Sequence, residues 1–255
     1  MKLNVGALSM YHITDGHHRE TARWHDADHK AEVIATVPGI FVSQRWVTPP
    51  GGLSLRPASP LAHGGGEYVN LYWSSGSDAE LSRDFADLGS RLSAVGRMRP
   101  ADEYMEKVWP MHSRARIYLD SVHARPGLVT SAEAAVVATS NTALLTVIDS
   151  VEETRLAEYG AWQRDHYIPM VLGTGIFTAA ALCTLRASAN RDDGQLVTLY
   201  FLESAAPEAG YLQFCEIRAQ WSAAGRLGPQ GSGSGYRRIL ETLAVPSIGN
   251  YSFYA

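Results

Sequence analysis

One pattern occurs twice in this chain, and this repetition restricts its fold more than any other feature. Residues 162–177 read WQRDHYIPMVLGTGIF, and residues 24–41 read WHDADHKAEVIATVPGIF. In both, a tryptophan and a histidine lie about one helical turn apart, which predicts that they share a face of one helix. A glycine then ends the helix, and an apolar strand begins with Ile-Phe. The sequence therefore predicts an internal duplication.

The predicted elements follow the same order in both halves. We expect residues 1–125 to form the first repeat, 126–141 an Ala-rich linker and 142–255 the second repeat. The strands are predicted at 7–14, 41–47, 67–74, 116–122, 143–149, 176–185, 195–203 and 236–245, and the helices at 19–36, from 78, at 152–171 and at 207–224. Each half thus reads β-α-β-β-α-β, the order of a ferredoxin-like unit.

A β-α-β-β-α-β unit with an aromatic-x-x-x-His helix followed by Pro-Gly resembles the dimeric α+β barrel superfamily. EthD-like proteins and antibiotic-biosynthesis monooxygenases are its most similar branches. The resemblance implies an α+β fold in which two ferredoxin-like repeats build the barrel within one chain. It also implies a pocket between sheet and helices in each unit. The superfamily includes cofactor-free oxygenases, cyclases, isomerases, lyases and haem enzymes, so the fold alone does not fix the reaction.

The net charge of the chain limits the kinds of partner that it is expected to bind. A net charge of -4 and a pI near 6.1 argue against nucleic acid and anionic membranes. Two cysteines do not make a disulfide framework, and the first residues lack the apolar run of a signal peptide. We expect a cytoplasmic protein whose partner is a small aromatic substrate, with a homodimer as a further option.

The two halves differ in polarity at matched strand positions. The matched positions are Ser43-Gln44-Arg45 with Ala179-Ala180-Ala181, Tyr68 and Asn70 with Leu196 and Thr198, Tyr72 with Tyr200, and Tyr11 and His12 with Val147 and Ile148. Buried polar groups cost free energy unless they have partners, so a cluster of them marks a site or a satisfied network. The sequence therefore predicts the principal pocket in the first half and a mainly structural second half.

The residue types in the first half suit an anionic substrate. Strand alternation places Ser43 with Arg45 on one face, and Asn70 with Tyr72 on one face of the next strand. An arginine near such groups holds a carboxylate or phenolate by charge-assisted hydrogen bonds. The predicted catalytic residues are His29, His12, Arg45 and Tyr72, either histidine being able to move a proton near neutral pH. The predicted substrate-binding residues are Tyr11, Trp24, Phe41, Ser43, Trp46, Asn70, Trp73 and His166.

Several of these histidines are possible ligands of a metal ion or a haem. His25 and His29 lie one helical turn apart, a spacing that suits a divalent ion, but no glutamate or third ligand accompanies them. Haem requires an axial ligand such as His166 together with a wide apolar pocket. Nucleotide-binding, nucleophile-elbow and CxxC motifs are absent from the sequence. We expect neither a metal nor an organic cofactor.

The sequence thus favours a cofactor-independent lyase, of decarboxylase type, that acts on a small aromatic or phenolic compound by proton transfer. Aromatic catabolism is the expected context. A cofactor-independent monooxygenase or a polyketide-type cyclase is the first alternative. A protein that binds a small molecule without catalysis is the second.

Overall fold

A computed structural model describes residues 2–48, 68–97, 108–138, 140–186, 195–228, 236–247 and 251–252. In these residues, nine strands form one sheet. The elements of the first half are β1 (Val5–Ile13), α1 (His18–Trp24), η1 (His25–His29), α2 (Lys30–Thr36), β2 (Ile40–Val47), β3 (Tyr68–Ser74), α3 (Asp78–Ala94) and β4 (Val108–Ala124). Most match the predicted ranges within a few residues, but β4 is longer than predicted at its N-terminal end.

The second half begins with an element that the sequence did not predict. Helix α5 (Ala132–Val137) lies within the predicted linker 126–141. The remaining elements are β5 (Ala143–Val151), η3 (Glu153–Arg155), α6 (Leu156–Trp162), η4 (Gln163–Tyr167), α7 (Ile168–Leu172), β6 (Ala179–Arg186), β7 (Gln195–Leu202), α8 (Pro207–Ala223), β8 (Tyr236–Pro246) and β9 (Tyr251–Ser252). The short strand β9 was also not predicted.

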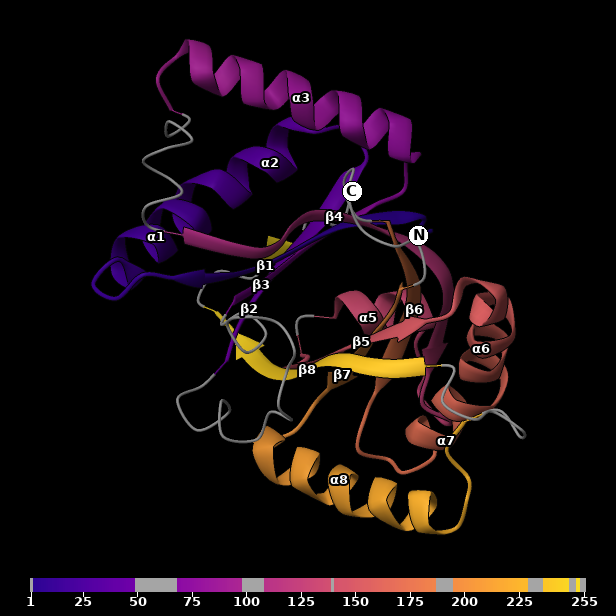
Figure 1. Cartoon of the computed structure of the whole chain (residues 1–255). Coiled ribbons are helices and arrows are strands. Elements are labelled where there is room, and N and C mark those ends of the chain that lie inside the picture. Colours follow the sequence, from indigo (N-terminus) through magenta and orange to yellow (C-terminus); the bar gives the residue numbers. More distant parts are fainter. Residues whose placement is uncertain are drawn as a thin grey trace.

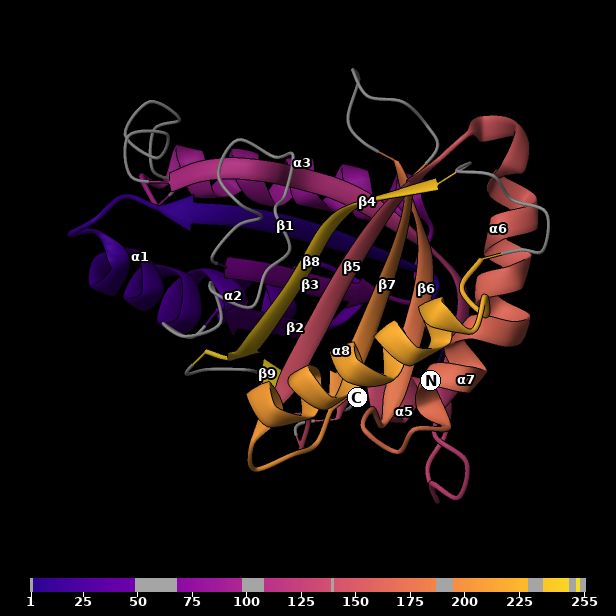
Figure 2. The same ribbon diagram turned by 60° about the horizontal axis from the view of Figure 1, so that its bottom comes forward.

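Eight of the strands close into a barrel. The neighbours run β3-β1-β4-β6-β7-β5-β8-β2, and β2 also pairs with β3, which joins the two ends of the series. The halves meet where β4 pairs with β6 and where β2 pairs with β8 (Figures 1 and 2). The seam between β2 and β8 consists of two residue pairs in the described residues, and β9 pairs with the neighbouring part of β2. The predicted α+β class with a barrel inside one chain is therefore confirmed.

Apolar side chains fill the interior of the barrel. They come from every strand of the barrel and include Leu8, Trp46, Trp73 and Phe201. Helix α5 joins this cluster through Val136, which is fully buried. The backbone carbonyl oxygen of Val136 accepts a hydrogen bond from the Gln44 side chain. The 126–141 segment is therefore part of the core as well as a connection. A polar site must lie elsewhere, on the outer faces of the strands.

The helices cover those outer faces. Helices α1, α2 and α3 lie at the top of Figure 1, whereas α6 and α7 lie at its right and α8 at its bottom. Val33 and Leu88 pack with Tyr72 in the first half, and Ile168 and Phe214 pack with Tyr200 in the second. None of the helices in the described ranges has the length and apolar character that a bilayer-spanning helix needs.

The strand register shifts the matched positions on the first and second strands of the two halves. Tyr68 pairs with Tyr11 and Leu196 pairs with Asp149, so Asp149 is the match of Tyr11, where the sequence comparison placed Val147. By the same reasoning Arg45, which pairs with Asn70, matches Leu182 rather than Ala181, because Leu182 pairs with Thr198. Sequence similarity alone could not fix this register, because the loops of the two halves differ in length. The second half therefore has a buried acid on its first strand.

Gly6 gives a test of the packing inside the barrel. A Cβ atom at Gly6 would lie 2.9 Å from the Tyr72 carbonyl oxygen and 2.9 Å from Ile117 Cγ1. Gly6→Ala is therefore expected to lower the free energy of unfolding by roughly 1–3 kcal/mol. Gly89→Ala is the control, because Gly89 lies in α3 with no neighbour within 4 Å, and it should stabilise by about 0.5–1 kcal/mol. Urea denaturation checks both, and equal effects would contradict the close contact.

Candidate functional site

Polar side chains converge between the first three strands and helix η1. Strand alternation turns Tyr11, Arg45 and Asn70 to the outer face of the sheet, where the helix covers them. The register brings them together, because Arg45 pairs with Asn70 across β2 and β3 while Tyr11 of β1 pairs with Tyr68. All three side chains are buried. The sequence predicted one face for Ser43 with Arg45 and one face for Asn70 with Tyr72, and both faces prove to be the outer face of the sheet.

The covering helix contains a π-helical turn that positions its side chains. Such a turn contains one more residue than an α-helical turn, which changes the direction of side chains, and it is frequent at functional sites. In η1 the His25 ring is buried, while His29 stacks on Trp24 with ring centroids 4.8 Å apart. The stacked pair agrees with the predicted shared face of Trp24 and His29.

The second half has a π-helical turn at the matched position. Helix η4 also follows a tryptophan, Trp162, whose ring stacks on Tyr167 with centroids 5.1 Å apart. Tyr167 therefore occupies the place of His29. His166, which was predicted to share a face with Trp162, is exposed. A π-helical turn brings residues five positions apart onto the same face. Tyr167, five positions after Trp162, therefore meets the Trp162 ring, and His166, four positions after it, does not.

Five residues of the first half form a closed ring of polar contacts. Arg45 Nε donates to Tyr11 Oη at 2.8 Å, and Tyr11 donates to Asn70 Oδ1 at 3.3 Å. The Asn70 amide lies 2.6 Å from His25 Nε2, and His25 Nδ1 lies 3.5 Å from Asp26 Oδ1. Asp26 Oδ2 then accepts from Arg45 Nη1 at 2.6 Å and closes the ring.

The ring fixes the proton positions of its members. Asn70 uses its oxygen to accept from Tyr11, so its nitrogen donates to His25 Nε2, and the His25 proton must sit on Nδ1 facing Asp26. Burial, opposed in part by the Asp26 carboxylate, lowers the pKa of His25 from 6.5 to about 3. Burial alone would raise the pKa of Asp26, but His25, Arg45 and Lys30 outweigh it, and the pKa falls below 3.8. At neutral pH, His25 is neutral and Asp26 is an anion.

Lys30 adds a second cation to this cluster. Its side chain is fully buried, and its Nζ lies 3.9 Å from Asp26 Oδ1. Burial lowers the pKa of Lys30 from 10.5 to about 8, with Asp26 opposing this effect and Arg45 adding to it. A lysine in this range can give or take a proton near neutral pH. The sequence reasoning assigned no role to Lys30 or Asp26, although both lie in the motif it singled out.

An aromatic side chain flanks the arginine. The guanidinium carbon of Arg45 lies 4.4 Å from the centroid of the Tyr68 ring, which stacks on Tyr11 at 5.4 Å. Burial alone would lower the pKa of Arg45, but the hydroxyl of Tyr11 and the carboxylate of Asp26 raise it overall. Tyr68 was compared between the halves but was not predicted as a site residue.

The other predicted residues lie in several different places. Ser43 is buried on the same face as Arg45, but Tyr72 packs with Val33 and meets Phe85 edge-on in an apolar cluster. Trp46, Trp73 and Phe41 pack with the barrel interior, on the opposite side of the sheet from Arg45. We call the group formed by Tyr11, His25, Asp26, Lys30, Arg45 and Asn70 the Arg45 cluster. The structure therefore does not bring these three aromatic residues to the Arg45 cluster. His12 lies in β1, and its side chain falls outside the described part of the structure.

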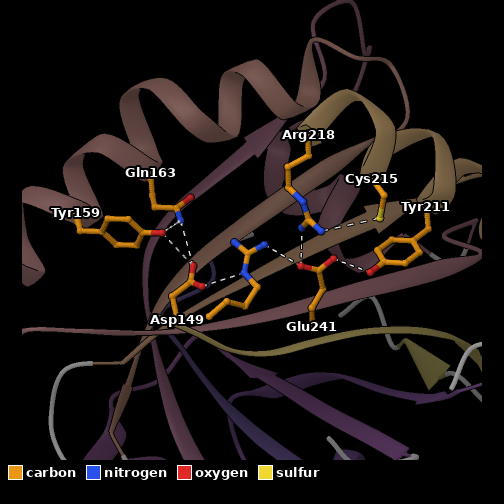
Figure 3. A network of polar contacts seen from close by, with 8 residues as sticks. Asp149, Tyr159, Gln163, Tyr211, Cys215, Arg218 and Glu241 are labelled. Atoms are coloured by element: carbon orange, nitrogen blue, oxygen red, sulfur yellow. Dashed lines mark hydrogen bonds and ion pairs between the residues drawn. The ribbon is translucent and has the colours of Figure 1, made fainter. Parts of the chain in front are cut away.

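A second polar network lies in the half that was predicted to be mainly structural (Figure 3). Arg238 donates to Asp149 at 3.0 Å and to Glu241 at 2.8 Å, and Arg218 donates to Glu241 at 2.6 Å. Tyr211 also donates to Glu241, at 2.6 Å. The sequence comparison missed this network because it did not include the fourth strands or helix α8, which supply most of its members.

A cavity of about 190 Å³ adjoins this network. Its walls are Tyr159, Trp162, Tyr167, Leu227, Tyr236, Arg218 and Arg238. This cavity lies in the second half. Trp162 and Tyr167, from the same helical segment as His166, contribute to its walls, whereas the His166 side chain is exposed and is not part of them. The principal pocket that the sequence placed in the first half stays a prediction.

The donor sets do not fit a metal or haem. Within the described ranges, no group of three histidine, cysteine or acidic side chains is arranged to hold a metal ion. Haem would need an axial ligand in an open apolar cavity, but no histidine lines the cavity of the second half, and the buried His25 is held by Asn70. The described residues therefore support no role for a metal ion or a haem.

No family model matches the chain, and no curated protein matches it either. Solved structures do match. An anthrone oxidase-like protein superimposes with a TM-score of 0.59 at 10% identity, covering 96% of this chain and 92% of that one. A proposed monooxygenase from Fusobacterium nucleatum gives 0.56 at 8% identity, covering 99% and 98%. A dye-decolorizing protein from V. cholerae gives 0.51 at 9% identity, covering 97% and 95%. The likeness shows a dimeric α+β barrel type of fold.

Proposed function

We propose that this protein is an enzyme that transfers a proton to or from a small aromatic or phenolic anion at the Arg45 cluster. The observation that carries this proposal is the fully buried Lys30, which lies 3.9 Å from Asp26 and has a pKa lowered to about 8. Groups with such perturbed titration concentrate at functional sites. The ring around Asp26 supports a positioned site, since hydrogen bonds link Asp26, Arg45, Tyr11, Asn70 and His25 in series.

Each residue of the cluster has a distinct proposed role. Arg45, with Asn70 and Ser43 on the same face, holds the anionic group of the substrate. Lys30 carries the proton, because His25 is neutral at physiological pH and its proton faces Asp26. His29 and His12 are the alternative proton carriers, and Tyr72 the further polar contact. Trp24 and Tyr11 supply aromatic surface next to His29 and Arg45. Trp46, Trp73, Phe41 and His166 have no part in this proposal.

The favoured reaction is a lyase reaction, namely the decarboxylation of a hydroxylated aromatic acid. The bond between ring carbon and carboxylate breaks, its electron pair stays on the ring carbon, and carbon dioxide leaves. The charged Lys30 gives its proton to that carbon, and solvent restores the proton afterwards. The balance requires no oxidant or reductant, so the side chains of the cluster are sufficient.

A cofactor-independent monooxygenase is the second candidate. The names of two solved structures of the same fold, an anthrone oxidase-like protein and a proposed monooxygenase, favour it. Such a reaction would begin from the same bound aromatic anion but would consume oxygen. Turnover of hydroxybenzoates and polyhydroxylated aromatics under nitrogen and under air separates the two. Carbon dioxide release without oxygen supports the lyase, and product formation only in air supports the monooxygenase.

Lys30 gives the sharpest test of the mechanism. If its charged form donates the proton, kcat should fall as pH rises through about 8, and Lys30→Met should lose about 100-fold in kcat. Lys30→Arg keeps the charge but cannot release a proton in this range, so kcat should stay as low as in Lys30→Met. A pH profile that is unchanged in Lys30→Met would reject the assignment. Ligand affinity without any turnover in the wild type would indicate a binding protein.

We also propose that the fold arose by duplication of a ferredoxin-like unit, with the halves at 1–125 and 142–255. In its support, the described strands have the same order in each half, β4-β1-β3-β2 and β8-β5-β7-β6. The π-helical turn follows a tryptophan in both halves. An EthD-like ancestry and a homodimer of whole barrels belong to the same proposal. Separate expression of the two halves, followed by a test of whether they associate into one barrel, examines it.

A further inference from the structure

The cavity of the second half has walls that are mainly aromatic. Tyr159 stacks on Tyr236 with ring centroids 4.6 Å apart and lies 5.5 Å from Trp162, which in turn stacks on Tyr167. The rings therefore support one another and form a continuous apolar surface. Rigid aromatic walls of this kind bind planar ligands with little loss of side-chain freedom.

The charges beside the cavity have a defined arrangement. The side chains of Glu241 and Asp149 are 0% and 1% exposed, whereas those of Arg218 and Arg238 are 21% and 24% exposed. The carboxylates thus lie deeper than the arginines that bond to them, and Arg218 reaches Glu241 from helix α8 (Figure 3). Both arginines line the cavity, and neither acid does. A ligand in the cavity would therefore meet guanidinium groups and aromatic rings.

The same groups cannot exchange protons near neutral pH. Burial raises the pKa of Tyr159 and of Tyr167 above 10, and arginine does not lose its proton in this range. For Glu241, burial alone would raise the pKa, but Arg238 and Arg218 lower it overall, so the acid stays ionised. The cavity has the features of a binding site, and none of its described wall residues can donate or accept a proton for catalysis near neutral pH.

We propose that this cavity binds a small single-ring aromatic carboxylate, at a site separate from the Arg45 cluster. The volume of about 190 Å³ is below the roughly 300–1,000 Å³ of sites for drug-sized ligands, which limits the ligand to about one ring. The ring packs against Trp162, Tyr159 and Tyr236. The carboxylate meets Arg218 and Arg238, whose planar guanidinium groups match its geometry. This site does not depend on the function proposed above.

Benzoate is the probe, with benzyl alcohol as its uncharged counterpart. Calorimetric titration of the full chain should show one benzoate bound with a Kd of roughly 10 µM–1 mM and at least tenfold weaker binding of benzyl alcohol. Leu227→Trp places a larger side chain at the cavity wall and should abolish binding. Arg218→Gln removes one cation and leaves Glu241 bonded to Arg238 and Tyr211, so it should weaken benzoate binding about tenfold.

Lys30→Met is the control for the other half. Benzoate binding that survives Lys30→Met and is lost in Leu227→Trp supports the proposed cavity site, even if no turnover is ever found. Loss in Lys30→Met with retention in Leu227→Trp would place the ligand in the first half and overturn the proposal. So would equal affinities for benzoate and benzyl alcohol, or no saturable binding. A crystal grown with 4-bromobenzoate gives an independent readout, because anomalous scattering locates the bromine beside Trp162 or elsewhere.

Discussion

Replacing Arg45 with methionine is expected to lower the free energy of unfolding by about 3 kcal/mol, because it breaks a buried ion pair. The Arg45 side chain is 0% exposed and lies 2.6 Å from Asp26. Its loss leaves the Asp26 carboxylate with the more distant Lys30 and with Ser247, and it leaves Tyr11 without its donor. Methionine has a similar length and apolar stem, so the change removes charge with little change in volume.

The control for Arg45 is an arginine on the surface. Arg164 also contacts an acid, Asp120, but both side chains are 37% exposed, so Arg164→Met should cost less than about 1 kcal/mol. Asp26→Asn in the Arg45→Met background removes the unpaired charge and should recover part of the loss. Urea titrations of the four proteins measure this coupling. Equal destabilisation by Arg45→Met and Arg164→Met would show that the ring contributes nothing special.

The same substitution tests function separately from stability. If Arg45 holds the anionic group of the substrate, Arg45→Met should lose about 100-fold or more in kcat/KM, measured at a temperature where the variant is still folded. Arg164→Met should keep wild-type rates. Circular dichroism at the assay temperature shows whether the lost activity reflects unfolding.

The elements of this fold were largely predictable from the sequence. Apolar periodicity and glycine or proline breaks place most strands and helices within a few residues, and the repeated order of predicted elements indicated a barrel within one chain. The π-helical turns could not be predicted in this way, because their residues have ordinary helical character. Their effect is decisive at one point: His29 stacks on its tryptophan, whereas His166 is exposed.

Strand alternation already gives the side of the sheet on which Trp46 and Trp73 lie, but the predicted pocket placed both with residues of the other face. Phe41 differs, because it has the parity of Arg45 and lies at a register irregularity between Ile40 and Val42. Trp46 is next to Arg45 and Trp73 is next to Tyr72, so each tryptophan must face away from its polar neighbour. Both tryptophans are fully buried in the barrel interior. An aromatic wall for the Arg45 cluster has to come from residues of the same parity, such as Tyr11 and Tyr68.

The second polar network escaped prediction for a different reason. Asp149 was displaced from its match by two residues, and Glu241 lies on β8, which was not compared. Sheet register depends on pairing across strands that are far apart in the sequence, and loops of unequal length conceal it. The cations also differ in origin, because Arg45 comes from β2, whereas Arg218 and Arg238 come from α8 and β8.

His25→Gln is expected to make the protein more resistant to acid than the wild type. The pKa of His25 is lowered from 6.5 to about 3 in the folded state. The unfolded chain therefore takes up a proton below about 6.5, whereas the folded protein does not until about 3. Proton uptake by the unfolded state lowers stability as pH falls through this window. The full shift corresponds to roughly 5 kcal/mol, an upper limit that is approached only near its acid end.

Glutamine is the appropriate replacement, because it can accept from Asn70 and donate towards Asp26 without titrating. The second half already has Gln163 as the first residue of its π-helical turn, where it is buried and bonded to Tyr159. Between pH 7 and pH 4, His25→Gln should lose about 3 kcal/mol less unfolding free energy than the wild type. Asp26 titrates in both proteins, and the glutamine amide keeps a donor facing it in place of His25, with Arg45 and Lys30 unchanged. Urea unfolding followed by tryptophan fluorescence across this range gives the two slopes. His166→Gln, at an exposed histidine, is the control, and curves for His25→Gln that run parallel to the wild type would mean that His25 is not held neutral by burial.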